Sequence, residues 1–143
     1  RLVSDVPLGC FLSGGLDSST VLSFMSELTD EPVSTFSVGF DEGWASDELP
    51  AARSTAQAFG TRHHEIRLGP DEFLRLMPTA VWHRDEPLAE PSEIPLLALS
   101  RMAREHVTVV LVEVAHLDSS SASVDVATAL TDLPGAGPAP NAS

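Results

Sequence analysis

The sequence predicts an α/β fold in which a parallel sheet is flanked by helices. Short apolar runs alternate with helical apolar patterns along most of the 143 residues, and this alternation is typical of βαβ units with right-handed crossovers. The first run is almost continuously apolar, as in a strand buried on both faces of a parallel sheet. A glycine-rich turn separates that run from the first helical pattern. A chain of this length corresponds to about one domain.

The first half of the chain predicts two strands and two helices. Residues 6–12 form the first apolar run, and residues 21–28 carry apolar side chains at helical spacing before the sequence TDEP breaks the pattern. Residues 33–40 (VSTFSVGF) alternate and are rich in Val and Phe, which favours a second strand. Ser46 is the expected N-cap of a second helix that ends at Gly60.

The next segments complete a four-stranded pattern. Residues 61–68 predict the third strand, and the sequence GPDE at residues 69–72 opens a third helix. An acidic loop with two prolines, RDEPLAEP, occupies residues 84–91. A fourth helix is expected over residues 92–105 and a fourth strand over residues 107–111.

The composition changes after Leu111. Residues 112–117 carry few clear signals. From Asp118 onward Ser, Ala, Asp, Gly and Pro dominate, and because they bury little surface we expect residues 112–143 to form a flexible tail. Residues 124–133 could form one weak helix. The chain is therefore divided into an ordered part, residues 1–111, and a divergent tail.

Charge and cysteine content limit the partners and the compartment. The formal net charge is −13, which argues against nucleic acid or an anionic membrane as the primary partner. Cys10 is the single cysteine, so no internal disulfide is expected and a reducing compartment fits best. Neither a signal peptide nor an apolar membrane-spanning run is recognisable, and a cytoplasmic location is expected. Cys10 lies within the first predicted strand, which favours a core position over a nucleophile.

The most informative segment is SGGLDSS at residues 13–19. Gly14 and Gly15 permit a tight turn and a close approach of an anion to the backbone. The first amides of the following helix have no internal partners and carry the positive end of its dipole, so they can bind phosphate without a lysine. Ser13, Ser18 and Ser19 add hydroxyl donors. A serine-rich helix cap is the structural alternative, and the position of all seven residues behind a strand disfavours it.

Asp17 is the unexpected member of this loop, because a carboxylate repels phosphate. A Mg²⁺ ion between the two would explain it, since Mg²⁺ prefers carboxylate and phosphate oxygens. The common P-loop is excluded, because it requires G-x-x-x-x-G-K-[ST] and this chain contains no lysine.

Other residues with chemical potential have ordinary interpretations. His63 and His64 are adjacent on a strand and must point to opposite faces, so surface histidines are expected rather than a metal pair. Glu86 and its acidic neighbours form either an acid/base cluster or a solvated loop. Trp82 and the phenylalanines are expected in the core. Ligands of parallel sheets bind beyond the carboxyl ends of the strands, where residues 13–19, the end of residues 33–40 and residues 84–91 can converge.

Together these segments resemble the synthetase domain of glutamine-hydrolysing asparagine synthetases. The resemblance is carried in order by RLVSDVPLGCFLSGGLDSS, FSVGFDE, GTRHHEI, DEPLAEPSEIP and REHVTVVL, and it covers residues 1–111. It implies the adenine-nucleotide alpha-hydrolase-like fold of the PP-loop ATP pyrophosphatases, here truncated.

The resemblance implies a ligase that adenylates aspartate with ATP, releases pyrophosphate, and lets ammonia displace AMP. The ammonia comes from glutamine in a separate glutaminase domain. The resemblance also implies residue roles. The pyrophosphate is bound by Ser13, Gly14, Gly15, Ser18 and Ser19, and Asp17 holds Mg²⁺. Leu12 and Val38 flank the adenine, backbone groups near Val38 and Gly39 bind its edge, and Glu86 lies near the acyl substrate.

Two departures from the family pattern shape the expected activity. The glutaminase domain is missing, and Cys10 cannot replace its N-terminal nucleophile. After VTVVL the family continues with a second phosphate-side loop, S-G-x-G-x-D-E, where this chain reads VEVAHLD. We therefore expect a fragment that is inactive alone. The alternatives are another amide-forming synthetase of the same family, such as a β-lactam-forming enzyme, and a non-catalytic nucleotide-binding remnant. Catalytic residues and oligomeric state are not assigned by the sequence.

Overall fold

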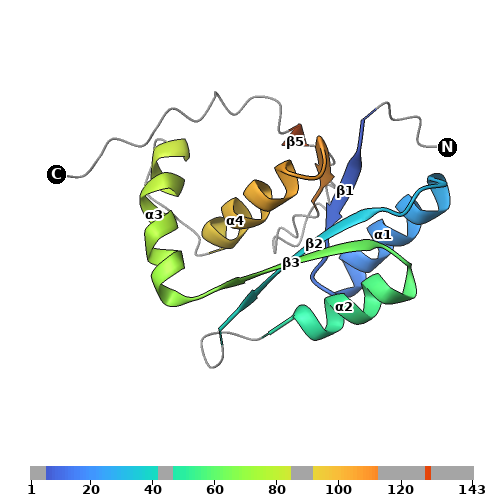
Figure 1. The fold of residues 1–143 in the computed structure, drawn as a ribbon, viewed down its shortest axis with the longest axis horizontal. Helices are drawn as coiled ribbons and strands as arrows, with labels where there is room; N and C mark the ends of the chain where they lie inside the picture. Colours follow the sequence, from blue (N-terminus) through green and yellow to red (C-terminus); the bar gives the residue numbers. More distant parts are fainter. Residues whose placement is uncertain (1–5, 42–46, 85–91, 113–127, 130–143) are drawn as a thin grey trace, which may run out of the picture.

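A computed structural model describes residues 6–41, 47–84, 92–112 and 128–129. Its elements, in chain order, are β1 (Leu8–Phe11), α1 (Leu16–Leu28), β2 (Ser34–Phe40), α2 (Leu49–Ala58), β3 (Arg62–Leu68), α3 (Pro70–Arg84), α4 (Glu93–Arg104), β4 (Val109–Leu111) and β5 (Thr128–Ala129) (Figure 1). The alternation of strands and helices is the one that the sequence predicts.

The strands form one sheet in the order β3-β2-β1-β4-β5. β1 pairs in parallel with β2 on one side and with β4 on the other, and β2 pairs in parallel with β3. The predicted parallel sheet with flanking helices is therefore confirmed. Because the chain first builds outward from β1 to β3 and then returns to the far side of β1, the strand order reverses between β1 and β4. Crevices at such reversal points are where open α/β sheets bind ligands.

β5 corrects the expectation for the tail. Thr128 and Ala129 pair antiparallel with Val110 and Val109, so a weak helix over residues 124–133 is wrong at these two positions. The physical reason is the edge of β4, which offers unpaired backbone groups that another extended segment can satisfy. The other residues of the predicted tail lie outside the described part of the chain.

Two helices begin at positions that the apolar pattern did not indicate. α1 starts at Leu16 rather than at residue 21, because its first turn is polar and its apolar stripe begins only one turn later. α2 starts at Leu49, where the Asp47 carboxylate accepts a hydrogen bond of 3.2 Å from the Leu49 amide. The expected N-cap, Ser46, lies outside the described residues.

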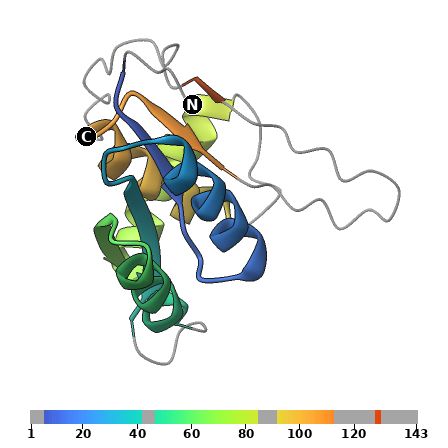
Figure 2. The same ribbon diagram turned by 90° about the vertical axis from the view of Figure 1, so that its right-hand side faces the viewer.

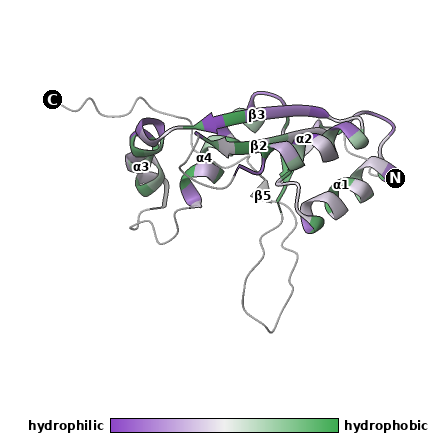
Figure 3. Ribbon diagram, turned by 90° about the horizontal axis from the view of Figure 1, so that it is seen from below, coloured by the Kyte–Doolittle hydropathy of each residue, from purple (hydrophilic) through white to green (hydrophobic). Residues whose placement is uncertain are grey.

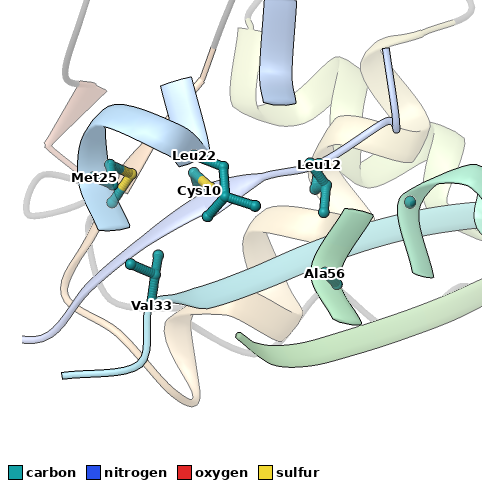
Figure 4. Close-up of a cluster of buried hydrophobic side chains, with 7 residues drawn as sticks. Cys10, Leu12, Leu22, Met25, Val33 and Ala56 are labelled. Carbon is teal, nitrogen blue, oxygen red and sulfur yellow. The ribbon is translucent and has the colours of Figure 1, made fainter. Parts of the chain in front are cut away.

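The helices cover both faces of the sheet. α1 and α2 pack on one face, where they enclose a cluster of buried side chains (Figure 4): Cys10, Leu12, Leu22, Met25, Val33, Ala52 and Ala56. α4 covers the other face over Phe36, Leu99, Ala103, Val107 and Val110. α3 packs against α4 through a third cluster formed by Leu68, Leu76, Ala80, Ile94 and Ala98. Among the described residues no helix is long and apolar enough to cross a membrane.

The expectation of a core position holds for Cys10 and Phe36, which are fully buried, and is wrong for Trp82 and Phe24. Trp82 is 74% exposed and Phe24 is also exposed. In α3 the buried positions are Leu76 and Ala80, one turn apart, so the side chain at position 82 points away from that face. The edge strand β3 is largely polar (Figure 3), which is a usual way to keep a sheet edge from pairing with other chains.

Candidate functional site

The chain leaves β1 through a turn that only glycine can make. Gly14 has a φ of +80°, and a Cβ atom there would lie 2.5 Å from the backbone nitrogen of Ala52. Gly15 follows as the N-cap of α1, with φ −72° and ψ 167°. Figure 2 shows β1 leading through this turn into α1. The sequence-predicted strand, glycine turn and helix start are therefore present in that order.

The serine hydroxyls of the loop are partnered within the loop. The Ser13 amide donates to Ser18 Oγ at 3.3 Å, and the two hydroxyls lie 3.0 Å apart. The Gly15 amide donates to Ser13 Oγ at 3.2 Å, and Ser19 Oγ donates to the Gly15 carbonyl at 2.6 Å. The structure thus gathers all three predicted serines around Gly15. Their first effect is to hold the turn closed.

The amides at the start of α1 are the free donors of this loop. Gly15 has no side chain with which to cap the helix, and the first backbone bond of the loop into the helix runs from the Ser19 amide to the Gly15 carbonyl at 3.1 Å. An α-helix leaves the amides of its first turn without internal partners, and its dipole adds partial positive charge there. The arrangement is that of an anion site built from backbone.

Asp17 lies exposed in the first turn of α1. Among the described residues no group of three or more His, Cys, Asp or Glu side chains gathers around one point. A single carboxylate is nevertheless sufficient for Mg²⁺ when phosphate oxygens and water complete the shell, because this ion retains several waters. The donor set therefore fits a metal that arrives with a phosphate ligand and does not fit a resident metal cage.

A pocket of about 150 Å³ opens beside the loop. Its lining is Phe11, Leu12, Ser13, Ser18, Phe36, Val38, Glu48, Leu99 and Val112. Four of the sequence-predicted residues therefore meet here, two apolar and two from the loop. The volume lies below the range of about 300–1,000 Å³ for complete small-molecule sites, so the pocket suits part of a nucleotide.

Both backbone groups of Leu12, its amide and its carbonyl, are hydrogen-bonded to β2. Its amide donates to the Phe36 carbonyl at 2.9 Å, and Ser37 Oγ donates to its carbonyl. Val38, two residues beyond Phe36 on β2, shares the α4 face of the sheet with it. Leu12 and Val38 both line the pocket, Leu12 from the cluster that α1 and α2 cover and Val38 from the cluster that α4 covers.

Two of the predicted site residues belong neither to the glycine loop nor to the described lining of the pocket. Gly39 is buried against Leu49 of α2, where a Cβ atom would collide with the leucine side chain, so its close packing explains the glycine. Glu86 lies outside the described residues. Sequence reasoning also missed Glu48, Phe36 and Leu99 as lining residues. Phe36 was detectable, because it shares a strand face with Val38.

His63 and His64 point to opposite faces of β3, as expected, but they are not surface residues. Thr35 Oγ1 lies 2.9 Å from His63 Nδ1, and the His63 side chain is only 13% exposed. His64 stacks on Phe36 with centroids 5.1 Å apart. Burial is the first cause that lowers the pKa of both rings. The short side chains of β2 beneath His63 leave room for a ring to fold inward, which the alternating pattern did not reveal.

Comparisons with known proteins agree with this geometry. The family model Asparagine synthase matches residues 1–113. The chain is 44% identical over 108 residues to asparagine synthetase [glutamine-hydrolyzing] 1 of Bacillus subtilis, covering 76% of this chain and 17% of that protein. It is 32% identical over 113 residues to amidase chyE of Penicillium rubens, covering 70% of this chain and 17% of that protein. The chain thus spans about a sixth of the length of these relatives.

A solved structure supports the fold alone. A predicted subunit of tRNA methyltransferase from Methanocaldococcus jannaschii superposes with a TM-score of 0.51 at 18% identity, over 80% of this chain and 55% of that one. Fold similarity at this identity carries no function. The family match, by contrast, covers most of the chain and includes the glycine turn and the pocket beside it. This chain belongs to the asparagine synthase family.

Proposed function

We propose that this chain supplies the pyrophosphate loop and part of the adenine pocket of an ATP-dependent amide-forming synthetase, with aspartate as the first candidate acyl substrate. One observation carries the proposal. The turn at Gly14 and Gly15 sets the first amides of α1 beside a pocket lined by Leu12 and Val38. A backbone anion site next to an apolar slot fits a triphosphate attached to a base.

In the proposed reaction the aspartate side-chain carboxylate attacks the α-phosphorus of ATP. The bond to the bridging oxygen breaks, pyrophosphate leaves, and ammonia then displaces AMP from the acyl-adenylate. Chemistry of this kind depends mainly on positioning and on neutralising charge. The amides at Leu16 to Ser18 would bind the leaving pyrophosphate, and Ser13 and Ser18 would keep those amides aligned. Mg²⁺, held at Asp17, would supply further charge neutralisation.

The proposal assigns this chain a partial role. Residues 1–111 would form the ATP-binding part, and of residues 112–143 the described part adds Val112 to the lining of the pocket. Glu86 would lie near the acyl substrate, and Val38 and Gly39 would present backbone groups to the adenine edge. Ammonia would come from a glutaminase activity elsewhere, and the protein would act in the cytoplasm. Alone, the chain is expected to bind ATP and pyrophosphate without completing asparagine synthesis.

The test uses the N-cap position of α1. Gly15 has a φ that any residue adopts, and an added Cβ meets only Ser13 Oγ at 3.2 Å. Asp is a preferred N-cap residue, so Gly15→Asp should keep the helix while its carboxylate takes the free amides and repels phosphate. Isothermal titration of the 143-residue chain with ATP, pyrophosphate and AMP, each with Mg²⁺, measures the effect.

We expect ATP and pyrophosphate to compete for one site and AMP to bind more weakly. Gly15→Asp should abolish binding of both while the melting temperature is retained or raised. Gly15→Asn is the matched control of nearly equal size, and the difference between the two variants isolates the charge. If the unmodified chain binds neither ATP nor pyrophosphate at millimolar concentration, the proposed function is wrong.

One observation favours a second acyl substrate. The similarity to a fungal protein named an amidase shows that relatives of this segment carry other names than asparagine synthetase. In the proposed function the described residues would form the nucleotide side of the site, which does not select the acid that is activated. Substrate-dependent exchange between ATP and labelled pyrophosphate, measured on an intact homologue with a panel of carboxylic acids, decides between aspartate and another acid.

A further inference from the structure

α2 forms one wall of the glycine turn, although it is remote from it in sequence. A Cβ atom on Gly14 would lie 2.5 Å from the Ala52 nitrogen and 2.7 Å from both the carbonyl carbon and the Cβ of Ala51. The loop backbone therefore rests directly on the backbone of α2, with no side chain between them. A shift of α2 relative to the sheet must move the loop or open a gap beneath it.

α2 is attached to β3 by a bidentate ion pair at the next residue. Arg53 follows Ala52, and its Nε and Nη2 donate to the two oxygens of Glu65 at 2.9 and 2.6 Å. Pairing of a guanidinium with a carboxylate through two parallel bonds fixes direction as well as distance. This contact lies on the β3 side of α2, and Gly14 touches the same turn of the helix.

A second ion pair holds the start of α2. Arg67 of β3 donates to Asp47 Oδ2 at 2.9 Å and to the Phe40 carbonyl at 2.9 Å. The other oxygen of Asp47 accepts the Leu49 amide at 3.2 Å. The N-terminal turn of the helix is therefore connected to the sheet through one carboxylate.

Glu65 is itself held in place. His63 Nε2 lies 3.2 Å from Glu65 Oε1, and His63 Nδ1 lies 2.9 Å from Thr35 Oγ1, which is also 2.9 Å from Thr61 Oγ1. The hydrogen bond from Arg53 is the first cause that lowers the pKa of Glu65, so its carboxylate is ionised when it receives the guanidinium. The chain of contacts runs from buried Thr35 to Arg53.

We propose that Arg53 and Glu65 are positioning residues for the pyrophosphate loop. They hold α2 against β3 so that Ala51 and Ala52 close the space beneath Gly14 and keep the α1 amides aligned. The ligand side of this inference rests on the proposed function, whereas the coupling between the ion pair and the loop does not. Neither residue touches the pocket, so each acts through α2.

The test compares Arg53, which attaches α2 to β3, with Arg62, whose ion pair lies outside α2. Arg53→Met keeps the apolar stem and removes the bidentate contact. Arg62→Met is the matched control, because the Arg62 side chain is 58% exposed against 60% for Arg53 and pairs with Glu31 through one contact of 3.4 Å. Hydrogen exchange of the Gly15 and Ser19 amides in the ligand-free 143-residue chain reports the loop. Isothermal titration with Mg²⁺ and ATP reports binding.

Arg53→Met should raise the exchange rates of both amides by about five-fold, at the upper end of the effect of a well-formed surface pair. It should raise the dissociation constant for ATP by a similar factor, and Arg53→Lys should fall between it and the unmodified chain, because a lysine cannot make the bidentate contact. Arg62→Met should change neither quantity.

Two results would overturn the inference. One is equal loop exchange in Arg53→Met and Arg62→Met. The other is a lower melting temperature in Arg53→Met with unchanged loop exchange and ATP affinity, which would mean that the pair stabilises the fold without positioning the loop. If the unmodified chain fails to bind ATP, the proposed function is wrong, while the exchange measurement still decides the coupling.

Discussion

The rings of His64 and His106 stack with centroids 3.9 Å apart and an interplanar angle of 24°. His64 belongs to β3 and His106 follows α4, so the stack joins the edge of the sheet to the end of the helix that covers it. Phe36 lies near both rings, with its centroid 5.1 Å from that of His64 and 6.0 Å from that of His106. A charge on His106 opposes protonation of His64 in this stack and contributes to the lowered pKa of His64.

The stack predicts a loss of stability in mild acid. The pKa of His64 is lowered from 6.5 first by burial and then by the charges of His106 and His63. A lowered folded-state pKa means that the unfolded chain binds more protons below pH 6.5, so the free energy of unfolding falls as the pH drops from 6.5. His64→Gln should flatten this dependence between pH 6.5 and 5 in urea titrations. An unchanged slope would contradict the role of the stack.

Part of the acid sensitivity should remain in that variant. His63 also has a lowered pKa, caused first by burial, and it contributes in the same window. Glu65 acts in a lower window. Its pKa is lowered from 4.5 mainly by Arg53, so its stabilisation is present above pH 4.5 and is lost as the pH falls below that value. Arg53→Met should therefore weaken the pH dependence of the free energy of unfolding below pH 4.5. It should leave in place the dependence between pH 6.5 and 5, which the histidines cause.

The two glycines with positive φ in the described part of the chain predict different costs of substitution. Gly14→Ala adds a methyl group against the α2 backbone in a left-handed conformation, so we expect a loss of about 2–5 kcal/mol from strain and overpacking together. Gly60 has a φ of +63° and nothing within 4 Å of an added Cβ, so Gly60→Ala should cost about 1–2 kcal/mol. Urea unfolding measures both. Equal losses in the free energy of unfolding would mean that α2 shifts to accommodate the methyl group at position 14.

The buried thiol predicts chemical inertness. Cys10 is fully buried, and burial raises its pKa to about 12. Since the thiolate is the reactive form, the folded chain should react with a disulfide reagent at pH 8 only as fast as it unfolds. A free thiol peptide under the same conditions is the control. Rapid stoichiometric labelling without urea would show that the first strand is accessible.

The exposed carboxylate of the loop predicts a metal-dependent change in affinity. Asp17→Asn should weaken ATP binding in the presence of Mg²⁺ by about ten-fold and leave metal-free binding equal or improved, because the carboxylate repels phosphate unless a cation lies between them. Asp71→Asn is the control, since Asp71 is also exposed in the first turn of a helix, α3. Calorimetric titrations with and without Mg²⁺ compare the two. A weaker affinity in both conditions would assign Asp17 to the loop structure.

The sequence predicts the sheet and the loop well, because both depend on local signals. The apolar run before Ser13 and the glycine pair after it are read within a few residues. The contact of Gly14 with Ala51 and Ala52 is different, because it joins segments that the sequence does not bring together. The same is true of the bond between Arg53 and Glu65, where two charged side chains on separate elements look like ordinary surface groups.

Failures of sequence reasoning have a common physical cause. Trp82 was assigned to the core because large aromatic side chains are usually buried, yet exposure is decided by which face of α3 packs on α4. A surface position is expected for His63 from the strand pattern, yet Thr35 provides a hydrogen-bond partner for its Nδ1 inside the fold. In both cases the outcome depends on neighbours from another element, which periodicity within one segment does not describe.

The strand order has a consequence for how the molecule assembles. Between β1 and β4 the chain makes two other strands and all four helices of the described part. Closing a longer loop costs more entropy, so β1, β2 and β3 are expected to associate before β4 joins them. Val110→Ala should then accelerate unfolding and leave the folding rate nearly unchanged in stopped-flow experiments. During synthesis, the crevice at the strand reversal would be completed only after β4 has been made.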